Sequence, residues 1–381
     1  MFKKLAFILL TFTLYGFVSI PHNNNTLNLK CVSGVIIDQN SGRILYSKNG
    51  DKVLPMASTT KIITAIVAIE NGNLRDLVTV PKAAAAISGS KVGLKVGEKV
   101  TLEELLYGLI LKSGNDAAIA IAQHIGGSAK GFAKLMNDKA IELGAYNTSF
   151  VTPHGLDAQN HYTTAVDLAK ISAYAMNNQV FARISSTKNI SGGVSGKFNR
   201  VYSNINKFLY KLENADGVKT GYTGGAGKCL VASVKHNGGR YISVVFNSND
   251  RWNDAEKMVK FAEKNYKLIK IYASSNLRNK FRVYGGMLKY VNGTTNNDLY
   301  LPVLKDDTEA LDTQIFVPSS LFSPINKNDH IGNLVVFIKD KIVAKYPIFS
   351  KDEVKSNNDI KMKSSYKGYE YSSAQLRLKT F

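Results

Sequence analysis

Three short strings constrain this chain more than any other feature of its sequence. They are Ser58-Thr59-Thr60-Lys61, Ser113-Gly114-Asn115 and Lys219-Thr220-Gly221, in this order along the chain. Any one of them is a weak signal, because short patterns with two fixed positions occur by chance in most long proteins. Three such strings in order, each in a suitable local context, instead indicate one catalytic site built from distant segments.

The first string pairs a hydroxyl with an amine. Ser58 and Lys61 are three residues apart at an expected helix start, which places their Cβ atoms roughly 5–6 Å apart on one face. A serine becomes nucleophilic when a base takes its proton, and a lysine is such a base when burial lowers its pKa. Taken alone, however, a helix cap at Ser58 with a solvated Lys61 would be the favoured interpretation.

The other two strings offer groups that bind and relay. Ser113 and Asn115 lie on a tight turn between two expected helices, where a hydroxyl can pass a proton and an amide can hold a peptide. Lys219 and Thr220 end an expected strand and can hold a carboxylate, while Gly221 lets a substrate backbone approach the strand edge. Each string alone is better explained as a turn or a strand end.

Apolar periodicity predicts strands at both ends of the first part of the chain and helices between them. Thr101 is an expected helix cap that Glu104 completes as a capping box, and Asn237-Gly238-Gly239 is a hairpin signal. This pattern predicts an α+β fold, an antiparallel sheet flanked by helices. The expected strands are 34–38, 43–46, 218–220, 229–234 and 241–246, and the expected helices are 58–70, 102–111, 117–125, 131–143, 164–176 and 252–271.

The pattern changes after a polar stretch at 275–280. We expect a catalytic domain over 30–274, followed by a small all-β domain over 281–350 with short alternating strands. Its expected turns are Gly285-Gly286, Asn292-Gly293 and Lys339-Asp340. The tail, 351–381, has no apolar period and is expected to be disordered.

The N-terminus has the pattern of an export signal. Two lysines precede an almost continuous apolar run from Leu5 to Ile20, so residues 1–25 are expected to be a signal peptide. No clear cleavage site follows, which leaves an uncleaved anchor as the alternative. We expect an exported, extracytoplasmic protein, in the cell wall or at the outer face of the cytoplasmic membrane.

The formal net charge is +20, which favours anionic surroundings. For an exported chain these would be a membrane surface or an anionic wall polymer, although a lysine-rich composition alone can also explain the charge. Nucleic acid is not expected, because the lysines are dispersed. The six histidines show no metal-ligand spacing, so neither a metal nor a cofactor is expected. Cys31 and Cys229 are best interpreted as two buried or reduced thiols, with a single bridge left open.

The three strings and their flanks resemble a known family. The carrying segments are 54–61, 92–98, 105–109, 113–118 and 216–223. They are similar to the low-molecular-weight penicillin-binding proteins, the serine-type D-alanyl-D-alanine carboxypeptidases, whose motif set is S-x-x-K, S-x-N and K-T-G. The resemblance covers about residues 34–270 and, more loosely, the β module to 349.

The resemblance implies a role for each motif residue. Ser58 would attack the carbonyl between the two terminal D-alanines of a peptidoglycan stem peptide, and Lys61 would take its proton. Ser113 would relay that proton to the leaving D-alanine, and Asn115 would bind the peptide amide. The N–H groups of Ser58 and Tyr222 would form the oxyanion hole.

The resemblance also implies how the substrate is held. Lys219 and Thr220 would bind its terminal carboxylate on the strand that continues through Gly221, and Arg251 resembles an additional carboxylate-binding arginine. β-Lactams would acylate Ser58, since they mimic D-Ala-D-Ala. The chain departs from the family in lacking an amphipathic helix over 360–381, and in having Thr223-Gly224-Gly225 where an acidic residue is common.

Three other functions compete with the carboxypeptidase. A class A β-lactamase shares all three strings but needs a glutamate to activate water, and Asp157 is the only acid between Tyr146 and Asp167. A DD-endopeptidase that cuts cross-links has the same chemistry and stays open. A non-catalytic wall-binding protein would not need the full set of reactive residues.

Overall fold

The computed structural model describes residues 27–191, 198, 200–274, 279–295, 297–305, 311–357 and 371–376, the last of these as backbone. The expected signal segment, 1–25, lies outside the described residues. Within the described ranges no helix is both long and apolar enough to cross a bilayer.

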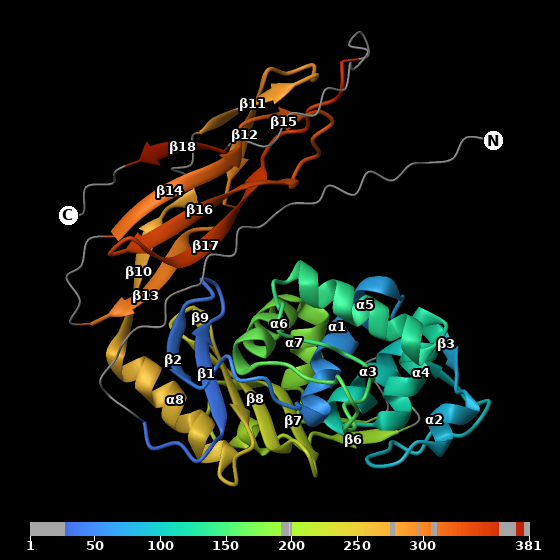
Figure 1. The fold of residues 1–381 in the computed structure, drawn as a ribbon. Coiled ribbons are helices and arrows are strands. Elements are labelled where there is room, and N and C mark those ends of the chain that lie inside the picture. Colours follow the sequence, from blue (N-terminus) through green and yellow to red (C-terminus); the bar gives the residue numbers. More distant parts are fainter. Residues whose placement is uncertain are drawn as a thin grey trace.

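A five-stranded antiparallel sheet forms the centre of the first part of the chain (Figure 1). Its strand order is β2-β1-β9-β8-β7, so strands from both ends of this region pair in the middle and β7 is an edge. The strands are β1 (Ser33–Asp38), β2 (Ile44–Lys48), β7 (Ala215–Thr223), β8 (Gly227–His236) and β9 (Gly239–Phe246).

Helices cover both faces of this sheet because its strands are apolar on both faces. In β1, Val35 and Ile37 face one core and Ile36 faces another, as the period of two requires. The first core holds most of the helices. These are α1 (Lys61–Asn71), α2 (Lys82–Ala86), α3 (Leu102–Leu111), α4 (Asn115–Gly126), α5 (Ala129–Glu142), α6 (Ala165–Asn177) and α7 (Gln179–Ser186), with the 3-10 turns η1 (Ala57–Thr60) and η2 (Lys207–Tyr210).

Helix α1 lies at the centre of that core, and every residue from Lys61 to Ala68 is buried. A helix that is apolar all round can only be stable inside a protein. The opposite face of the sheet is covered by α8 (Arg251–Asn265), whose Ala255, Met258, Val259 and Ala262 form the i, i+3, i+4, i+7 stripe of an amphipathic helix. Figure 1 shows α8 on the side of the sheet away from the other helices.

The residues after α8 form a second, all-β assembly with its own core. A two-stranded sheet, β10-β13, leads into a seven-stranded sheet of order β15-β11-β12-β17-β16-β14-β18. The strands are β10 (Tyr266–Tyr272), β11 (Lys280–Tyr284), β12 (Tyr290–Thr294), β13 (Leu299–Leu304), β14 (Leu311–Pro318), β15 (Leu321–Phe322), β16 (His330–Ile338), β17 (Lys341–Ser350) and β18 (Tyr371–Leu376). Two further small sheets, β3 (Leu77–Thr79) with β4 (Lys99–Thr101) and β5 (Asn189–Ser191) with β6 (Val201–Ser203), edge the helical region.

The predicted α+β fold with a C-terminal all-β part is confirmed, with corrections to single elements. The helix expected over 252–271 ends at Asn265, because the following residues pair as β10 with β13. The turn expected at Asn292-Gly293 lies inside β12, where the strand changes its partner from β11 to β17. Part of the tail expected to be disordered is also a strand, since 371–376 adds to β14 through main-chain pairing, which needs no apolar period.

The predicted helix cap and hairpin are confirmed. Thr101 accepts from Glu104 N at 3.2 Å, but the Glu104 carboxylate accepts from Arg200 and Tyr202 and does not complete a capping box. The β8–β9 hairpin turns at Asn237-Gly238, where both residues have positive φ as a tight hairpin requires. Cys31 and Cys229 are both free and buried, which confirms the interpretation of two unpaired thiols.

Candidate active site

The three strings meet where η1, the start of α4 and the edge strand β7 come together. Ser58 lies in the η1 turn and is half-buried. The β7 backbone passes so close that a Cβ on Gly221 would lie 3.0 Å from Ala57 Cβ and 3.1 Å from Ser58 N. Glycine is therefore required here for the strand to lie against η1.

Lys61 connects the first two strings. It is fully buried, and its Nζ lies 2.9 Å from Ser58 Oγ, 2.8 Å from Asn115 Oδ1 and 2.6 Å from the His154 carbonyl oxygen. The Asn115 amide is oriented by its own Nδ2, which donates to Ser88 O at 2.7 Å, so Oδ1 must face Lys61. Two of the three partners of Nζ are thus pure acceptors.

This geometry fits a neutral lysine. A neutral amine has two N–H groups, which the oxygens of Asn115 and His154 take up, and its lone pair is then directed at Ser58 Oγ. Burial, followed by the positive charge of Lys219, holds the pKa of Lys61 well below its ordinary value, and the Asp116 carboxylate offsets this in part. The arrangement can therefore remove the Ser58 proton.

Lys219 supplies positive charge on β7. Its side chain is buried and donates to Thr220 O at 3.0 Å. Burial, and then the Arg251 guanidinium, lower the pKa of Lys219 to about 7. Arg251 itself donates through Nη1 to Gly221 O at 2.8 Å and to Cys229 O at 3.1 Å, so it joins β7 to β8 at the position where Gly221 approaches Ser58. Each of these contacts is to protein, and each leaves further N–H groups for a substrate carboxylate.

Three more of the predicted site residues remain to be placed: Ser113 before α4, and Thr220 and Tyr222 on β7. Ser113 is buried and has φ +61°, an unusual conformation for serine that sets the turn into α4. Thr220 is buried, whereas the Tyr222 side chain is 67% exposed. Only the backbone of Tyr222 is thus held in place, as β7 pairs Tyr222 with Lys228 of β8.

Asp116 directly follows the second string, and no role for it was predicted from the sequence. It is fully buried at the first turn of α4, and its carboxylate accepts from the backbone N–H groups of Val92, Gly93 and Leu94 at 2.9 to 3.2 Å. It therefore fixes the loop whose Ser88 carbonyl orients Asn115. An acid directly after S-x-N, at the expected start of an apolar helix, was the signal that could have revealed this role.

The contribution of the loop after residue 150 was also not predicted from the sequence. This loop contacts η1 and Lys61 through backbone groups and through two neutral histidines. His161 Nε2 lies 2.9 Å from Thr60 Oγ1, and its Nδ1 accepts from Val151 N. Burial lowers the pKa of His161 to about 4, and burial likewise lowers the pKa of His154 to about 4. Gly155 lies so close to Ala57 that any Cβ would overlap its carbonyl, so this loop clamps η1.

Asp157, the only acid between Tyr146 and Asp167, contacts the β7–β8 hairpin. Its Oδ1 accepts from Thr223 Oγ1 at 2.7 Å, and its Oδ2 accepts from Gly225 N at 3.0 Å. Both oxygens thus hold the β7–β8 hairpin. A carboxylate from another segment of the chain thus lies beside Thr223-Gly224-Gly225.

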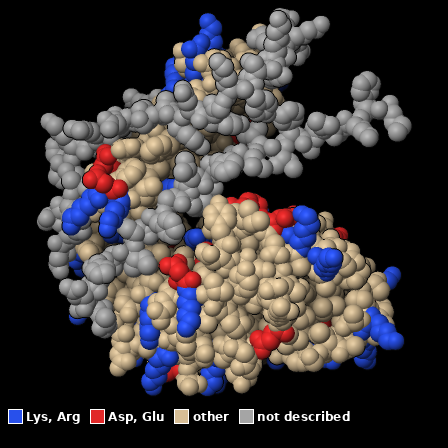
Figure 2. Space-filling view, viewed as in Figure 1, with Lys and Arg blue, Asp and Glu red and all other residues tan. Residues whose placement is uncertain are grey.

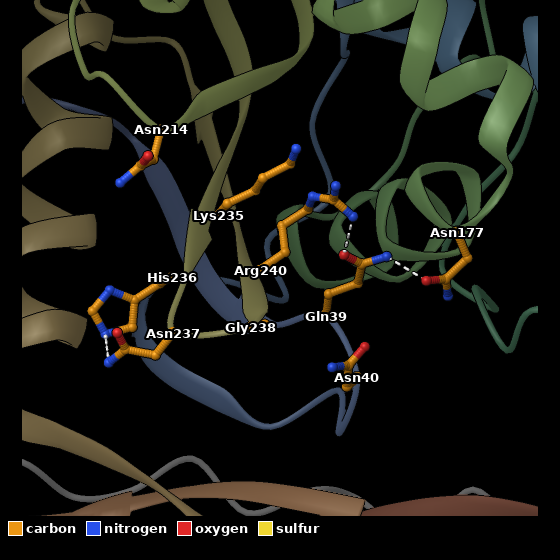
Figure 3. Close-up of a pocket in the computed structure, with 10 residues that line it drawn as sticks. Gln39, Asn40, Asn177, Asn214, Lys235, His236, Asn237, Gly238 and Arg240 are labelled. Carbon is orange, nitrogen blue, oxygen red and sulfur yellow. Dashed lines mark hydrogen bonds between the residues drawn. The ribbon is translucent and has the colours of Figure 1, made fainter. Parts of the chain in front are cut away.

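A polar hollow of about 380 Å³ lies elsewhere, at the β1–β2 and β8–β9 turns (Figure 3). Gln39 bridges Arg240 and Asn177 across it. Lys235, also in its wall, is six strand positions from Cys229, which pairs with Gly221. At about 3.3 Å per residue this is roughly 20 Å from the nucleophile turn, so the hollow is not part of this site.

Comparisons with known proteins agree with this geometry. The family model described as D-alanyl-D-alanine carboxypeptidase matches residues 20–250, and the one described as penicillin-binding protein 5, C-terminal domain, matches 266–356. The D-alanyl-D-alanine carboxypeptidase DacF of Bacillus subtilis is 34% identical over 334 residues, 85% of each chain.

Solved structures give the same result. Penicillin-binding protein 5 of Haemophilus influenzae has a TM-score of 0.67 at 29% identity, covering 88% of this chain and 100% of its own. The Streptomyces K15 DD-transpeptidase has a TM-score of 0.59 at 34% identity, covering 62% of this chain and 98% of its own. The resemblance inferred from the motifs is confirmed, and so is the assignment to a serine hydrolase. The chain belongs to the D-alanyl-D-alanine carboxypeptidase family of serine peptidases.

Proposed function

We propose that Ser58 is the nucleophile and Lys61 its general base in the removal of the terminal D-alanine from peptidoglycan stem peptides. The observation that carries this proposal is the environment of Lys61 Nζ, which has two fixed acceptors and Ser58 Oγ within 2.9 Å. In the neutral amine this arrangement leaves the lone pair for the serine proton alone.

The reaction would proceed in two halves. Ser58 Oγ bonds to the carbonyl carbon between the two D-alanines as its proton passes to Lys61, and the N–H groups of Ser58 and Tyr222 hold the resulting oxyanion. The C–N bond then breaks, and the proton passes through Ser113 to the departing amine of D-alanine. Water hydrolyses the ester that remains on Ser58, with Lys61 again as base.

The positive end of the site would recognise the terminal carboxylate. Lys219 and Thr220 would bind it directly, and Arg251 would add a second cation beside them. Asn115 would hold the amide of the preceding residue. A β-lactam presents a carboxylate and a strained amide in the same relation, and would therefore acylate Ser58.

The alternatives are less well supported by the same contacts. A class A β-lactamase requires an acid that activates water, whereas both oxygens of Asp157 are bound to the β7–β8 hairpin. A DD-endopeptidase would use the same residues, so the products must separate it from a carboxypeptidase. A non-catalytic wall-binding function would not explain why Lys61 is buried within 2.9 Å of Ser58 Oγ.

We place this activity outside the cytoplasm, at the cell wall or the outer face of the membrane. Stem peptides are found there, and the net charge of +20 suits anionic wall polymers or lipid headgroups. Fractionation of cells with an antibody against the chain tests this placement, and recovery in the cytosol would contradict it.

Replacing Ser58 by Ala tests the nucleophile. We expect Ser58→Ala to abolish both D-alanine release and covalent labelling by benzylpenicillin, because no other hydroxyl contacts Lys61 Nζ among the described residues. Intact-mass spectrometry with peptide mapping measures the adduct, and circular dichroism checks the fold. A folded variant that still labels would show that another residue is the nucleophile. Cleavage of purified cross-linked dimers by the natural chain would identify an endopeptidase.

Replacing Lys219 tests carboxylate recognition. We expect Lys219→Ala to lower kcat/KM about 100-fold for a peptide ending in D-Ala-D-Ala, since a charge-assisted hydrogen bond contributes about 1.5–3 kcal/mol. The same peptide with an amidated end should lose far less. Equal losses on both peptides would mean that Lys219 does not contact the carboxylate.

A further inference from the structure

The exposed apolar side chains of the all-β assembly gather at one end of it. Over 266–357 the large apolar side chains that are exposed among the described residues are Met287 (69%), Phe322 (59%), Tyr290 (54%), Leu288 (50%) and Tyr284 (37%). All five belong to the β11–β12 hairpin or to β15 beside it, and Figure 1 shows these strands at the end away from the helices. We call these five side chains the hairpin-tip surface.

Strand pairing explains why they share one face. In β11, Val283 is buried in the core, so its neighbours Arg282 and Tyr284 point the other way. Tyr290 pairs with Arg282, and Phe322 pairs with Tyr284, which puts them on that same outer face. The Tyr284 and Phe322 rings lie 5.9 Å apart, and Met287 and Leu288 extend beyond them in the turn.

The tip is held rigid by backbone contacts. Met287 N donates to Lys355 O at 2.8 Å, Asn357 N donates to Gly285 O at 2.8 Å, and Gly286 bridges Ser356. The exposed side chains thus stand on a fixed turn, so a partner would meet them without having to order a loop first.

Basic side chains surround the apolar ones. The Arg282 guanidinium lies 4.8 Å from the Tyr284 ring centroid. Lys280 is exposed two positions before Arg282 in β11 and therefore points to the same outer face. Neither Arg282 nor Lys280 forms an ion pair within the described ranges. The acids of the adjoining segment are Asp352, which accepts from Asn292, and Glu353. Figure 2 shows Lys and Arg at this end of the molecule, at the top of the view.

We propose that the hairpin-tip surface docks on an anionic lipid bilayer, with Met287 and Leu288 in the headgroup region and the tyrosines at its border. Tyrosine beside lysine and arginine is the composition of a membrane-interface contact. A soluble polyanion would use the cations but would gain nothing from five exposed apolar side chains. This proposal rests on the anionic surroundings named in the proposed function and selects lipid headgroups among them. It does not depend on the chemistry at Ser58.

A local probe separates this contact from any other membrane attachment of the full chain. Met287→Cys and, as the matched control, Ile141→Cys on α5 are labelled with the environment-sensitive nitrobenzoxadiazole dye. Ile141 is 60% exposed, and the natural Cys31 and Cys229 are buried and so are protected from the dye. Vesicles contain equal parts of phosphatidylglycerol and phosphatidylcholine, or phosphatidylcholine alone. Fluorescent penicillin labelling of the same samples reports Ser58 separately.

We expect a blue shift and quenching by headgroup-depth nitroxide lipids for the probe at 287, with anionic vesicles only. The probe at 141 should not respond. Arg282→Gln with Lys280→Gln should weaken partitioning of the tip about 25-fold, because each basic group near an anionic surface contributes about fivefold. Lys82→Gln with Lys235→Gln, two exposed lysines of the first domain, is the charge control and should leave the probe response unchanged.

Four outcomes would overturn the inference. The two probes could respond alike, or the chain could sediment with vesicles while the probe at 287 stays unshifted. The probe at 287 could respond to polyglutamate and not to vesicles, which would indicate a soluble polyanion. It could also shift with protein concentration in the absence of lipid, which would indicate a second copy of the chain.

Discussion

Lys61 shows at the scale of one residue how burial is converted into reactivity. Its amine is surrounded by apolar α1 and by two oxygens that only accept hydrogen bonds, so the charged form lacks solvation and the neutral form keeps its partners. Lys219 is buried nearby with its pKa lowered to about 7. Two lysines with lowered pKa values can then serve as base and as carboxylate ligand at one pH.

The pKa of Lys219 predicts the alkaline limb of the pH profile. Lys219 must be charged to hold a carboxylate, so kcat/KM for a peptide with a free terminus should fall as the pH rises through about 7. Arg251 lowers that pKa, so Arg251→Gln should move the limb upward by about one pH unit. Arg251→Lys keeps a positive charge and should leave it near its original position.

A pH–rate series on the three proteins measures this shift. An unmoved limb in Arg251→Gln would mean that the limb belongs to another group. A limb that moves equally in Arg251→Lys would indicate that the contact with Gly221 O matters and that the charge does not.

The reactive side chains of the candidate site could be predicted from the sequence, but the backbone groups that orient them could not. Ser58, Lys61 and Asn115 were predictable because their residue types and spacing carry the chemistry, and hydrogen bonds bring these three together. The His154 carbonyl was not predictable, since any residue has one. Asp116 was predictable in principle, as an acid at the start of an apolar helix directly after the second string.

At the scale of elements, the clamp around η1 decides where the nucleophile lies. The loop that carries His154, Gly155 and His161 contacts η1 from one side, and Gly221 of β7 contacts it from the other. Neither contact has a sequence signal of its own. The elements predicted well were those whose apolar period agrees with their final partners, such as α3 and β9.

The elements predicted poorly are those that tertiary pairing decides. Residues 266–271 carry Leu and Ile at spacings that also fit a helix, and only the presence of β13 makes them a strand. Asn292 and Gly293 are typical turn residues, yet the Asn292 side chain and backbone both donate to Asp352 within β12.

The lowered pKa of His161, in the loop that contacts η1, predicts that the first domain loses stability in acid. The pKa of His161 is lowered from 6.5 to about 4, so the unfolded chain binds its proton first, and stability must fall as the pH drops through that interval. Between about pH 7 and pH 4 this one group should cost about 3 kcal/mol. His161→Gln should be less stable at neutral pH and should lose about 3 kcal/mol less on acidification.

Urea unfolding followed by fluorescence measures this difference, because the chain has a single tryptophan, Trp252 in α8 of the first domain. His330→Gln, in β16 of the seven-stranded sheet, is the control. Parallel acid profiles for the natural chain and His161→Gln would refute the assignment.

At the scale of the whole molecule, the two assemblies meet through the β1–β2 turn and the start of β10. Buried Arg43 donates to Pro302 O of β13, and its guanidinium lies 5.7 Å from the Tyr266 ring centroid. Tyr266 OH in turn donates to Leu45 O at 2.9 Å. The contact is polar and directional, and it fixes the second assembly to the central sheet at a distance from Ser58.

Replacing Arg43 should let the two assemblies unfold at different temperatures without changing the rate of acylation at Ser58. We expect Arg43→Ala to cost about 1–3 kcal/mol, since it leaves a buried carbonyl unpaired, and to split thermal unfolding into two transitions. Penicillin acylation should stay within about twofold, because Arg43 contacts Pro302 and Tyr266, on strands that carry neither Ser58 nor Lys61 nor Lys219. Calorimetry measures the transitions, with exposed Arg75→Ala as the control. A single, unshifted transition would show that Arg43 does not couple the two parts.

The pairing of β1 with β9 also sets the order in which the chain can fold. A chain that emerges N-terminus first, from a ribosome or a translocation pore, offers β1 only β2, and an isolated two-stranded hairpin is marginally stable in water. The central sheet closes when Phe246 has followed, after nearly the whole first domain has been released. Until then the strand that carries Lys219 has no sheet to join, so the nucleophile turn is made early and the site is completed late.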